Sequence, residues 1–169
     1  MDNTKDFIVE ESFKLFLNYS YEAVSINDIS KAIGLTKGAL YHHFKNKEEL
    51  FKTVVDKYLC IPDVVADIDT ISLADYILLC TSEAEKIIKR LFGFTLVFTP
   101  INYMSMFADA FRHYPDYAEL KGKFITREIE KTKKVLENAI KSGEIRGDIN
   151  TSLIAMNFFS INMGLAGNL

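Results

Sequence analysis

The sequence predicts an all-α protein, and three observations support that prediction. The 169 residues include only three prolines and eight glycines, so few positions interrupt a helix. Apolar residues recur at spacings of three and four, which is the period of a helix face. Ser or Asn stands three positions before an acidic residue at several points, a pattern typical of helix starts. We therefore expect an architecture built from helices.

The N-terminal region begins with two predicted helices. The first runs from about residue 5 to residue 18, and its broad apolar face consists of Phe7, Ile8, Phe13, Leu15 and Phe16. The second begins after Ser25, because Ser25 and Asp28 form a capping-box pattern that satisfies backbone N–H groups. It ends at Gly34, since glycine readily takes the left-handed conformation that a tight turn requires.

A third and a fourth helix follow the corner at Gly34. Thr36 is placed to cap the third helix, and Leu40 and Phe44 lie four residues apart, so both should face inward against the second helix. Asn46 then starts the fourth helix. Two short helices joined by a glycine corner form a helix-turn-helix, whose second helix can enter the DNA major groove.

The charge pattern favours contact between this corner and DNA. The net charge of the chain is −3, yet residues 31–47 contain four lysines and no acidic residue. A short basic patch can bind phosphates on an acidic protein, because salt confines the interaction to about 8 to 10 Å. A solvated surface is the alternative reading of such a patch. The basic residues coincide with the helix-turn-helix corner, which favours contact with DNA over the solvated surface.

Eight residues are the candidates for DNA contact. Thr36, Lys37 and Ala39 can reach base edges, and Gly38 has no side chain to hold the backbone away from the groove. Tyr41, His42 and Lys47 are better placed for phosphate oxygens. Lys47 also stands at the start of a helix, where the backbone favours anions. The full set is Ser25, Thr36, Lys37, Gly38, Ala39, Tyr41, His42 and Lys47.

The segment SINDISKAIGLTKGALYHHFKNKEELFKTVV, residues 25–55, resembles the DNA-binding module of the TetR family of bacterial transcriptional regulators, and the likeness runs from about residue 7 to residue 58. The resemblance implies a repressor that binds a palindromic double-stranded DNA operator as a homodimer. It also implies that a small-molecule effector binds the larger helical domain and reorients the two DNA-binding domains of the dimer. We accordingly assign residues 1–48 to a three-helix DNA-binding domain and residues 49–169 to a ligand-binding and dimerisation domain.

The C-terminal part contains two groups of candidate residues. An apolar effector pocket would use the aromatic and Met side chains of residues 94–111, although each of them can equally belong to the core. These candidates are Phe94, Phe98, Tyr103, Met104, Phe107 and Phe111. A stripe of small and polar residues on the final helix would let a second helix approach closely, which makes it a candidate dimer contact. It consists of Asn157, Ser160, Gly164 and Gly167.

Family members continue beyond the point where this chain ends, so the last helix is expected to be truncated. Either a tail is missing here, or dimerisation uses less surface.

Several function classes lack sequence support. Cys60 and Cys80 form no metal-binding or disulfide pattern, so no metal or cofactor is expected. No catalytic motif indicates an enzyme. The uncharged stretch 149–169 contains four Asn, two Ser and a Thr, which argues against a membrane span. The charged N-terminus argues against secretion, so a cytoplasmic location is expected. The remaining alternative is a ligand-binding or scaffold protein of the same fold that does not read DNA.

Overall fold

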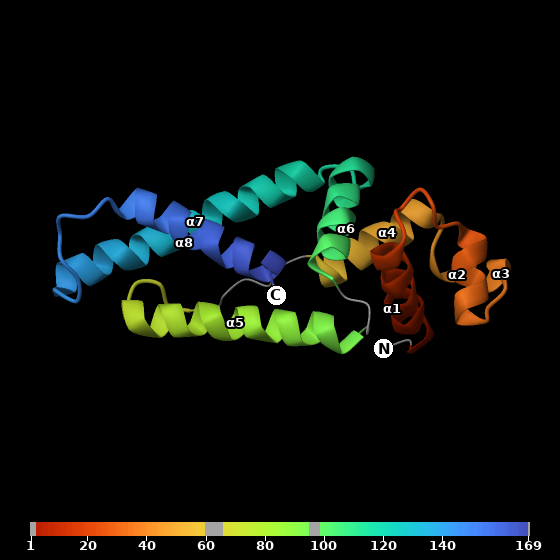
Figure 1. The fold of residues 1–169 in the computed structure, drawn as a ribbon, viewed down its shortest axis with the longest axis horizontal. Coiled ribbons are helices and arrows are strands. Elements are labelled where there is room, and N and C mark those ends of the chain that lie inside the picture. The colour runs from red at the N-terminus through yellow and green to blue at the C-terminus, as the bar shows by residue number, and fades with distance from the viewer. Residues whose placement is uncertain (1–2, 60–65, 95–98, 169) are drawn as a thin grey trace. The chain divides into compact units, whose positions relative to one another are not determined.

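The computed structural model describes residues 3–59, 66–94 and 99–168, and every regular element within these ranges is a helix (Figure 1). This confirms the all-α prediction. The bounds of the first four helices agree closely with the expected starts and stops. The helices are α1 (Asn3–Asn18), α2 (Ile26–Ile33), α3 (Lys37–His43), α4 (Lys47–Tyr58), α5 (Leu73–Phe94), α6 (Pro100–His113), α7 (Tyr117–Ser142) and α8 (Thr151–Asn168).

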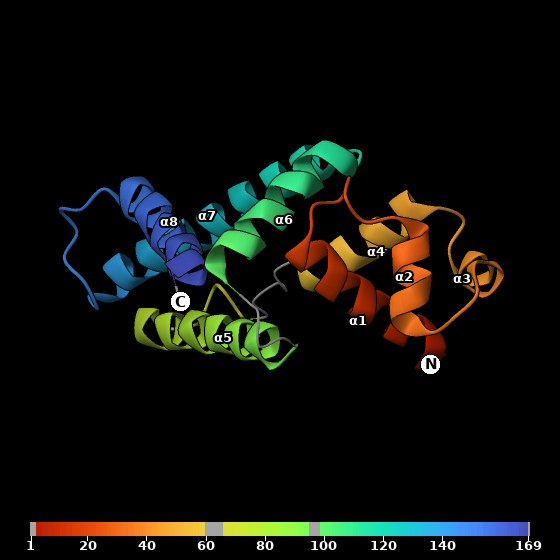
Figure 2. The ribbon, with the colours of Figure 1, turned by 45° about the vertical axis from the view of Figure 1, so that its right-hand side comes forward.

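The chain forms two compact units, and each contains residues from two separate parts of the sequence. The first unit consists of Met1–Ile61 and Leu91–Tyr117, and the second consists of Pro62–Arg90 and Ala118–Leu169. Residues 1–48 all belong to the first unit, and the assignment of separate domains on either side of residues 48 and 49 stays a prediction. The first unit extends beyond the three N-terminal helices because α4 and α6 both pack against α1 (Figure 2).

Aromatic stacking holds α1 against α4 in the core of the first unit. The Phe13 and Tyr58 rings stack with their centroids 4.0 Å apart, and Phe16 meets Phe51 edge-on at 5.0 Å. All four side chains are almost completely buried. Such pairs contribute packing energy beyond the apolar area they bury. The fourth helix is therefore the main support of α1.

Phe7, one of the residues expected on the apolar face of α1, lies outside the buried core. Its side chain is 45% exposed, whereas the neighbouring Ile8 is completely buried. Successive residues on a helix point about 100° apart. With Ile8 directed into the core, Phe7 turns to the surface beside α2.

The helix starts and the corner of the helix-turn-helix have the expected geometry. Ser25 Oγ accepts a hydrogen bond from Asp28 N at 3.2 Å, and Ser25 N donates to the Asp28 carboxylate at 2.9 Å. The hydrogen bonds from Ser25 lower the pKa of the Asp28 carboxyl group. Gly34 follows α2 with a φ of 68°, in the left-handed region. The capping box and the glycine corner are thus both confirmed.

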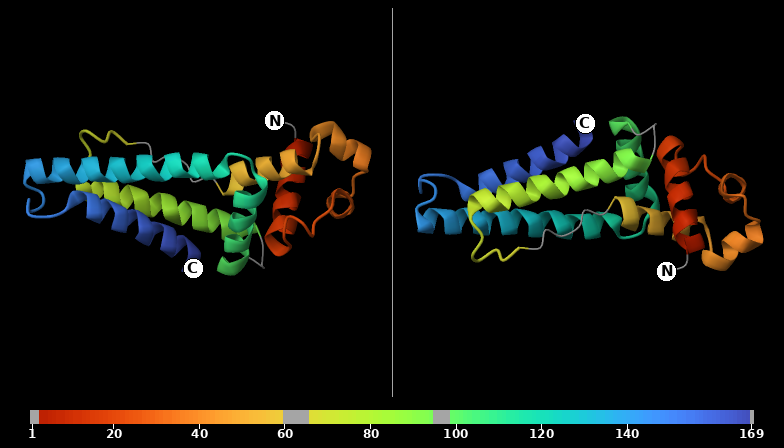
Figure 3. Two further views of the ribbon diagram at one scale, coloured as in Figure 1. Left: turned by 90° about the horizontal axis from the view of Figure 1, so that it is seen from above. Right: turned by 90° about the horizontal axis from the view of Figure 1, so that it is seen from below.

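Most of α5 packs with α7 and α8 in the second unit, where the three helices lie side by side (Figure 3). A buried hydrogen bond of 2.9 Å joins the Tyr76 hydroxyl on α5 to Thr132 Oγ1 on α7, and burial raises the pKa of Tyr76 to about 12. The centroid of the Tyr76 ring also lies 6.3 Å from that of the Phe158 ring on α8. A search of the described helices finds none with the length and apolar character of a membrane span.

The start of α5 has two caps, one local and one distant. Ser72 Oγ accepts a hydrogen bond from Asp75 N at 3.0 Å, as the sequence pattern predicts. The Glu144 carboxylate, in the turn after α7, accepts hydrogen bonds from the backbone N–H groups of Leu73 and Ala74 at 3.1 and 3.2 Å. A carboxylate at this position also complements the positive end of the helix dipole.

The Gly34 corner is testable by substitution at one position. A Cβ at residue 34 would meet no atom within 4 Å, so backbone strain is the only cost of a larger residue. We expect Gly34→Ala to lower the free energy of unfolding by about 1 kcal/mol, and Gly34→Asn to lower it by less, because Asn tolerates the left-handed region. Urea unfolding of both variants measures the difference. Equal losses would contradict a role for backbone conformation.

Candidate nucleic-acid interface

The orientation of α3 follows from two buried side chains. Leu40 is completely buried and Phe44 is 2% exposed, whereas the next residue after Leu40, Tyr41, points about 100° away and is 49% exposed. This confirms the predicted inward direction of Leu40 and Phe44. The remaining surface of α3 faces solvent, together with His42, while His43 is half-buried.

The first turn of α3 brings four of the eight candidate residues together. Thr36 is the N-cap, and its Oγ1 accepts a hydrogen bond from Ala39 N at 3.2 Å. Its hydroxyl hydrogen can still donate to another acceptor. Lys37 and Gly38 are exposed, and a Cβ at residue 38 would approach only Thr36 Oγ1, at 3.9 Å. This turn presents a cation, a hydroxyl and an uncovered stretch of backbone to solvent.

Ser25 is exposed, but its hydroxyl group already has two partners. Besides accepting from Asp28 N, Ser25 Oγ donates to Asp28 Oδ2 at 2.5 Å. A hydroxyl group has one hydrogen to donate. A hydrogen bond from Ser25 to DNA would therefore replace its bond to Asp28, and the predicted contact competes with the cap of α2.

Lys47 is held by the loop between α1 and α2. Its ammonium group donates to the backbone carbonyls of Tyr21 and Val24 at 3.0 and 3.2 Å, and it lies 4.0 Å from the centroid of the Tyr21 ring. An ammonium group has three hydrogens, so one remains for a further acceptor. The sequence pattern does not indicate this structural role, because the loop precedes Lys47 by more than twenty residues.

The fold adds a cation that the sequence reasoning missed. The Lys5 ammonium on α1 lies 5.3 Å from the centroid of the Phe44 ring, at the end of α3. Lys5 is exposed, as are Lys31 and Lys45. Since α1 packs against α2 and α2 against α3, a residue near the start of the chain lies beside the end of α3. A pattern confined to residues 31–47 cannot reveal it.

The adjacent histidines His42 and His43 contact each other through their rings. The His42 and His43 rings lie edge to face with centroids 5.5 Å apart. Across the part of the chain that the structure describes, no three His, Cys, Asp or Glu side chains are grouped closely enough to hold a metal ion.

Four of the six candidate pocket residues lie on α6. Met104 and Phe111 are 54% and 46% exposed, and Tyr103 and Phe107 are half-buried. The Phe107 and Phe111 rings meet at 5.3 Å, and both contact the Tyr117 ring. The side chain of Phe94 and all of Phe98 fall outside the described residues. Whether the six line one pocket therefore stays a prediction.

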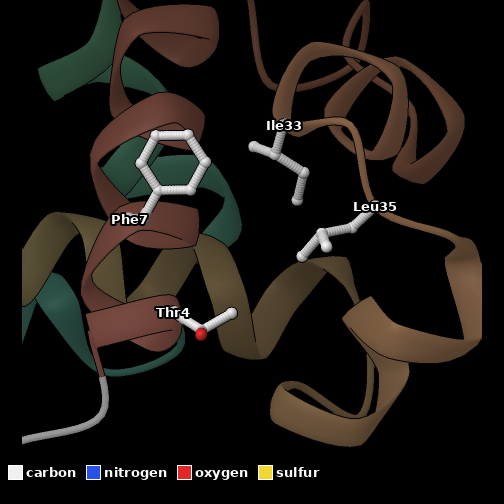
Figure 4. Close-up of a pocket in the computed structure, with 4 residues that line it drawn as sticks. All are labelled: Thr4, Phe7, Ile33 and Leu35. Atoms are coloured by element: carbon white, nitrogen blue, oxygen red, sulfur yellow. The ribbon is translucent and has the colours of Figure 1, made fainter.

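A small open groove lies in the first unit, beside the helix-turn-helix (Figure 4). Its volume is about 260 Å³, and its lining is Thr4, Phe7, Ile33 and Leu35. The exposed Phe7 ring lies across the groove from Ile33, and Thr4 lies across it from Leu35. None of these residues is among the predicted site residues.

The candidate dimer stripe lies on a helix without charged residues. Asn157 and Ser160 are exposed on α8, together with Leu153, Met156 and Ile161. Ser160 Oγ donates within the helix to the Met156 carbonyl at 2.9 Å. Gly164 and Gly167 belong to α8 but lie beyond the last residue whose surroundings are described. The stripe remains a prediction.

Comparison with known sequences identifies the N-terminal unit. Residues 8–54 match the profile described as bacterial regulatory proteins, tetR family, which spans α1 to α4. Over 52 residues the chain is 36% identical to IcaR of Staphylococcus epidermidis, a biofilm operon negative transcriptional regulator, covering 31% of this chain and 28% of IcaR. The first three relatives are matched over about a quarter to a third of their length.

Two longer alignments extend over nearly the whole chain. Over 168 residues it is 24% identical to the transcriptional regulator UidR of Escherichia coli, covering 98% of this chain and 81% of UidR. The structure of the SmeT–triclosan complex has the same fold, with a TM-score of 0.63 and 16% identity over 96% of this chain and 78% of that one.

The structural role of Lys47 predicts a loss of stability when its ammonium group is removed. Lys47→Met keeps most of the side-chain stem but leaves two loop carbonyls without their donor, so the free energy of unfolding should fall by about 1 to 2 kcal/mol. The matched change Lys45→Met affects an exposed side chain and should stay within about 0.5 kcal/mol. Urea unfolding compares the two. Equal effects would show that Lys47 does not hold the loop.

Proposed function

We propose that this chain, a member of the tetR family of bacterial regulatory proteins, is a ligand-responsive repressor that binds double-stranded DNA through α3. The observation that carries the proposal is the match of residues 8–54 to that family, since this segment contains the complete helix-turn-helix. Repression is supported by the name of IcaR as a negative regulator.

The surface of α3 suits the proposed contact with DNA. Lys37 can donate to guanine acceptors, and the Ala39 methyl group can contact a thymine methyl. Gly38 lets the backbone approach the groove. Tyr41 and His42 point away from the buried side of α3, toward the position of the phosphates in such a complex. Lys47 adds one N–H for a phosphate oxygen.

The proposed effector is a small hydrophobic molecule that contacts α6. Tyr103, Met104, Phe107 and Phe111 give this helix an adaptable aromatic and thioether surface, which suits an apolar ligand. The SmeT–triclosan complex supports small-molecule binding by a protein of this fold. The family resemblance supports release of DNA when the effector binds.

The proposed active form is a homodimer. A palindromic operator requires two DNA-binding domains whose recognition helices lie one turn of DNA apart. The uncharged α8, with Leu153, Met156 and Ile161 exposed around the stripe of Asn157 and Ser160, has the composition expected of a subunit contact.

Binding of the full chain to the DNA upstream of its own gene tests the proposed function. Fluorescence anisotropy in 50 to 200 mM salt measures affinity for this DNA and for an unrelated fragment of equal length. We expect specific binding to be at least about 10³-fold tighter than nonspecific binding, with a steep salt dependence. Equal affinity for the two fragments, or none for either, would favour the ligand-binding protein that does not read DNA.

Substitutions at Lys37 and Thr36 should change base preference. We expect Lys37→Ala to cost about 1 to 3 kcal/mol on the preferred DNA and far less on fragments altered at the contacted base pair. Thr36→Ala should show the same preference, with an added loss on every fragment because it also removes the N-cap of α3. Lys47→Met should weaken binding to all of these fragments and reduce the salt slope by about one. A panel of single-base operator variants separates the two patterns. Uniform losses from all three changes would contradict the assigned roles.

Gly38→Ala should separate stability from DNA binding. In the first turn of α3, Ala is a better helix former than Gly by up to about 1 kcal/mol, and the added methyl group meets nothing closer than 3.9 Å. The free energy of unfolding should therefore not fall. In contact with DNA the methyl group holds the backbone away from the groove, so affinity should drop about tenfold or more. Unchanged affinity would exclude close approach at residue 38.

A further inference from the structure

The backbone of Tyr21, in the loop between α1 and α2, is held by side chains from two other helices. Its N–H group donates to Asp109 Oδ2 on α6 at 2.7 Å, and its carbonyl accepts from the Lys47 ammonium on α4 at 3.0 Å. All of these residues belong to the first unit. Figure 2 shows this loop running past the C-terminal end of α6. A loop that would otherwise depend on water for both groups is thus fixed at one residue.

The Tyr21 ring extends the same connection. The His113 ring, also on α6, stacks on it with centroids 4.3 Å apart and an interplanar angle of 22°. The Lys47 ammonium lies 4.0 Å from the Tyr21 centroid, within the range of a cation–π contact. Glu22, the next residue in the loop, lies 3.5 Å from His113 Nε2. Tyr21 therefore links α6 to Lys47 through both its backbone and its ring.

Asp109 on α6 is the buried acceptor of the hydrogen bond from Tyr21 N. The residue is only 5% exposed, and a carboxylate is costly to bury unless hydrogen bonds satisfy it. Its bond to Tyr21 N is short and charge-assisted, which makes it one of the stronger hydrogen bonds a backbone group can form. Its other oxygen lies 3.4 Å from Arg112 Nη1, on a side chain that is 68% exposed. The bond to the loop is the shorter and better buried of the two.

We propose that Asp109 is a positioning residue for DNA binding: it fixes Tyr21, and through Tyr21 it holds Lys47 and the start of α2 in the arrangement that binds DNA. This proposal rests on the proposed function.

Three variants of the full chain test this role. Asp109→Ala removes the acceptor for Tyr21 N–H. Asp109→Asn keeps an acceptor oxygen without the charge, so it should retain part of the protection of the Tyr21 amide and part of the DNA affinity that Asp109→Ala loses. Arg112→Ala is the matched control, because it removes the other partner of the Asp109 carboxylate and leaves the loop contact in place.

Two measurements are made on each variant. Hydrogen exchange of the Tyr21 amide, followed by NMR without DNA, reports whether the loop is held. We expect about tenfold faster exchange in Asp109→Ala and little change in Arg112→Ala. Anisotropy with the upstream DNA should show about tenfold weaker binding for Asp109→Ala and a salt slope lower by about one, because Lys47 no longer meets its phosphate.

The outcomes distinguish the positioning role from a structural one. If Asp109→Ala matches Arg112→Ala in exchange and in affinity, the proposal fails. It also fails if Asp109→Ala loses affinity with an unchanged salt slope and Asp109→Asn gives no rescue, because a general loss of stability then accounts for the effect. Wild-type protein that binds no DNA overturns the proposed function, whereas wild-type binding that Asp109→Ala leaves intact overturns only the role of Asp109.

Discussion

The burial of Leu40 and Phe44 is the constraint on which the proposed interface depends. With these two side chains packed in the core, α3 has only one way to face, and its first turn and the Tyr41 side point to solvent. Gly34 supports this arrangement, since its left-handed backbone lets the chain turn between α2 and α3 within three residues. The side chains that α3 exposes for contact with DNA are therefore determined by the hydrophobic packing of the buried side of this seven-residue helix.

Lys47 connects this constraint to the rest of the first unit. Its position at the start of α4 suits a phosphate contact, yet two of its three hydrogens are used by the loop between α1 and α2. The same loop is held from α6 by Asp109. A residue proposed to bind DNA thus shares its support with the helix proposed to sense an effector. Stability and DNA affinity are consequently coupled at Lys47, whereas they are separable at Gly38.

The sequence predicts the local features of this fold well and the distant contacts poorly. The capping residues Ser25, Thr36 and Asn46 act within three positions of their partners, so short patterns reveal them. The bond between Asp109 and Tyr21 joins residues 88 positions apart, and no periodic pattern marks either one. The division into units has the same cause, since α6 joins α1 and α4 through contacts that only the folded chain creates. The exposure of Phe7 is not predictable from the pattern, because an apolar residue beside a core position gives the same signal.

Hydrogen exchange of the full chain, with and without the DNA upstream of its gene, tests the central claim most directly. If α3 reads DNA, bound DNA protects the backbone amides of residues 36–47 most strongly, and an unrelated fragment at the same concentration gives much weaker protection. Protection that is absent from residues 36–47, or that is equal for both fragments, would contradict the account.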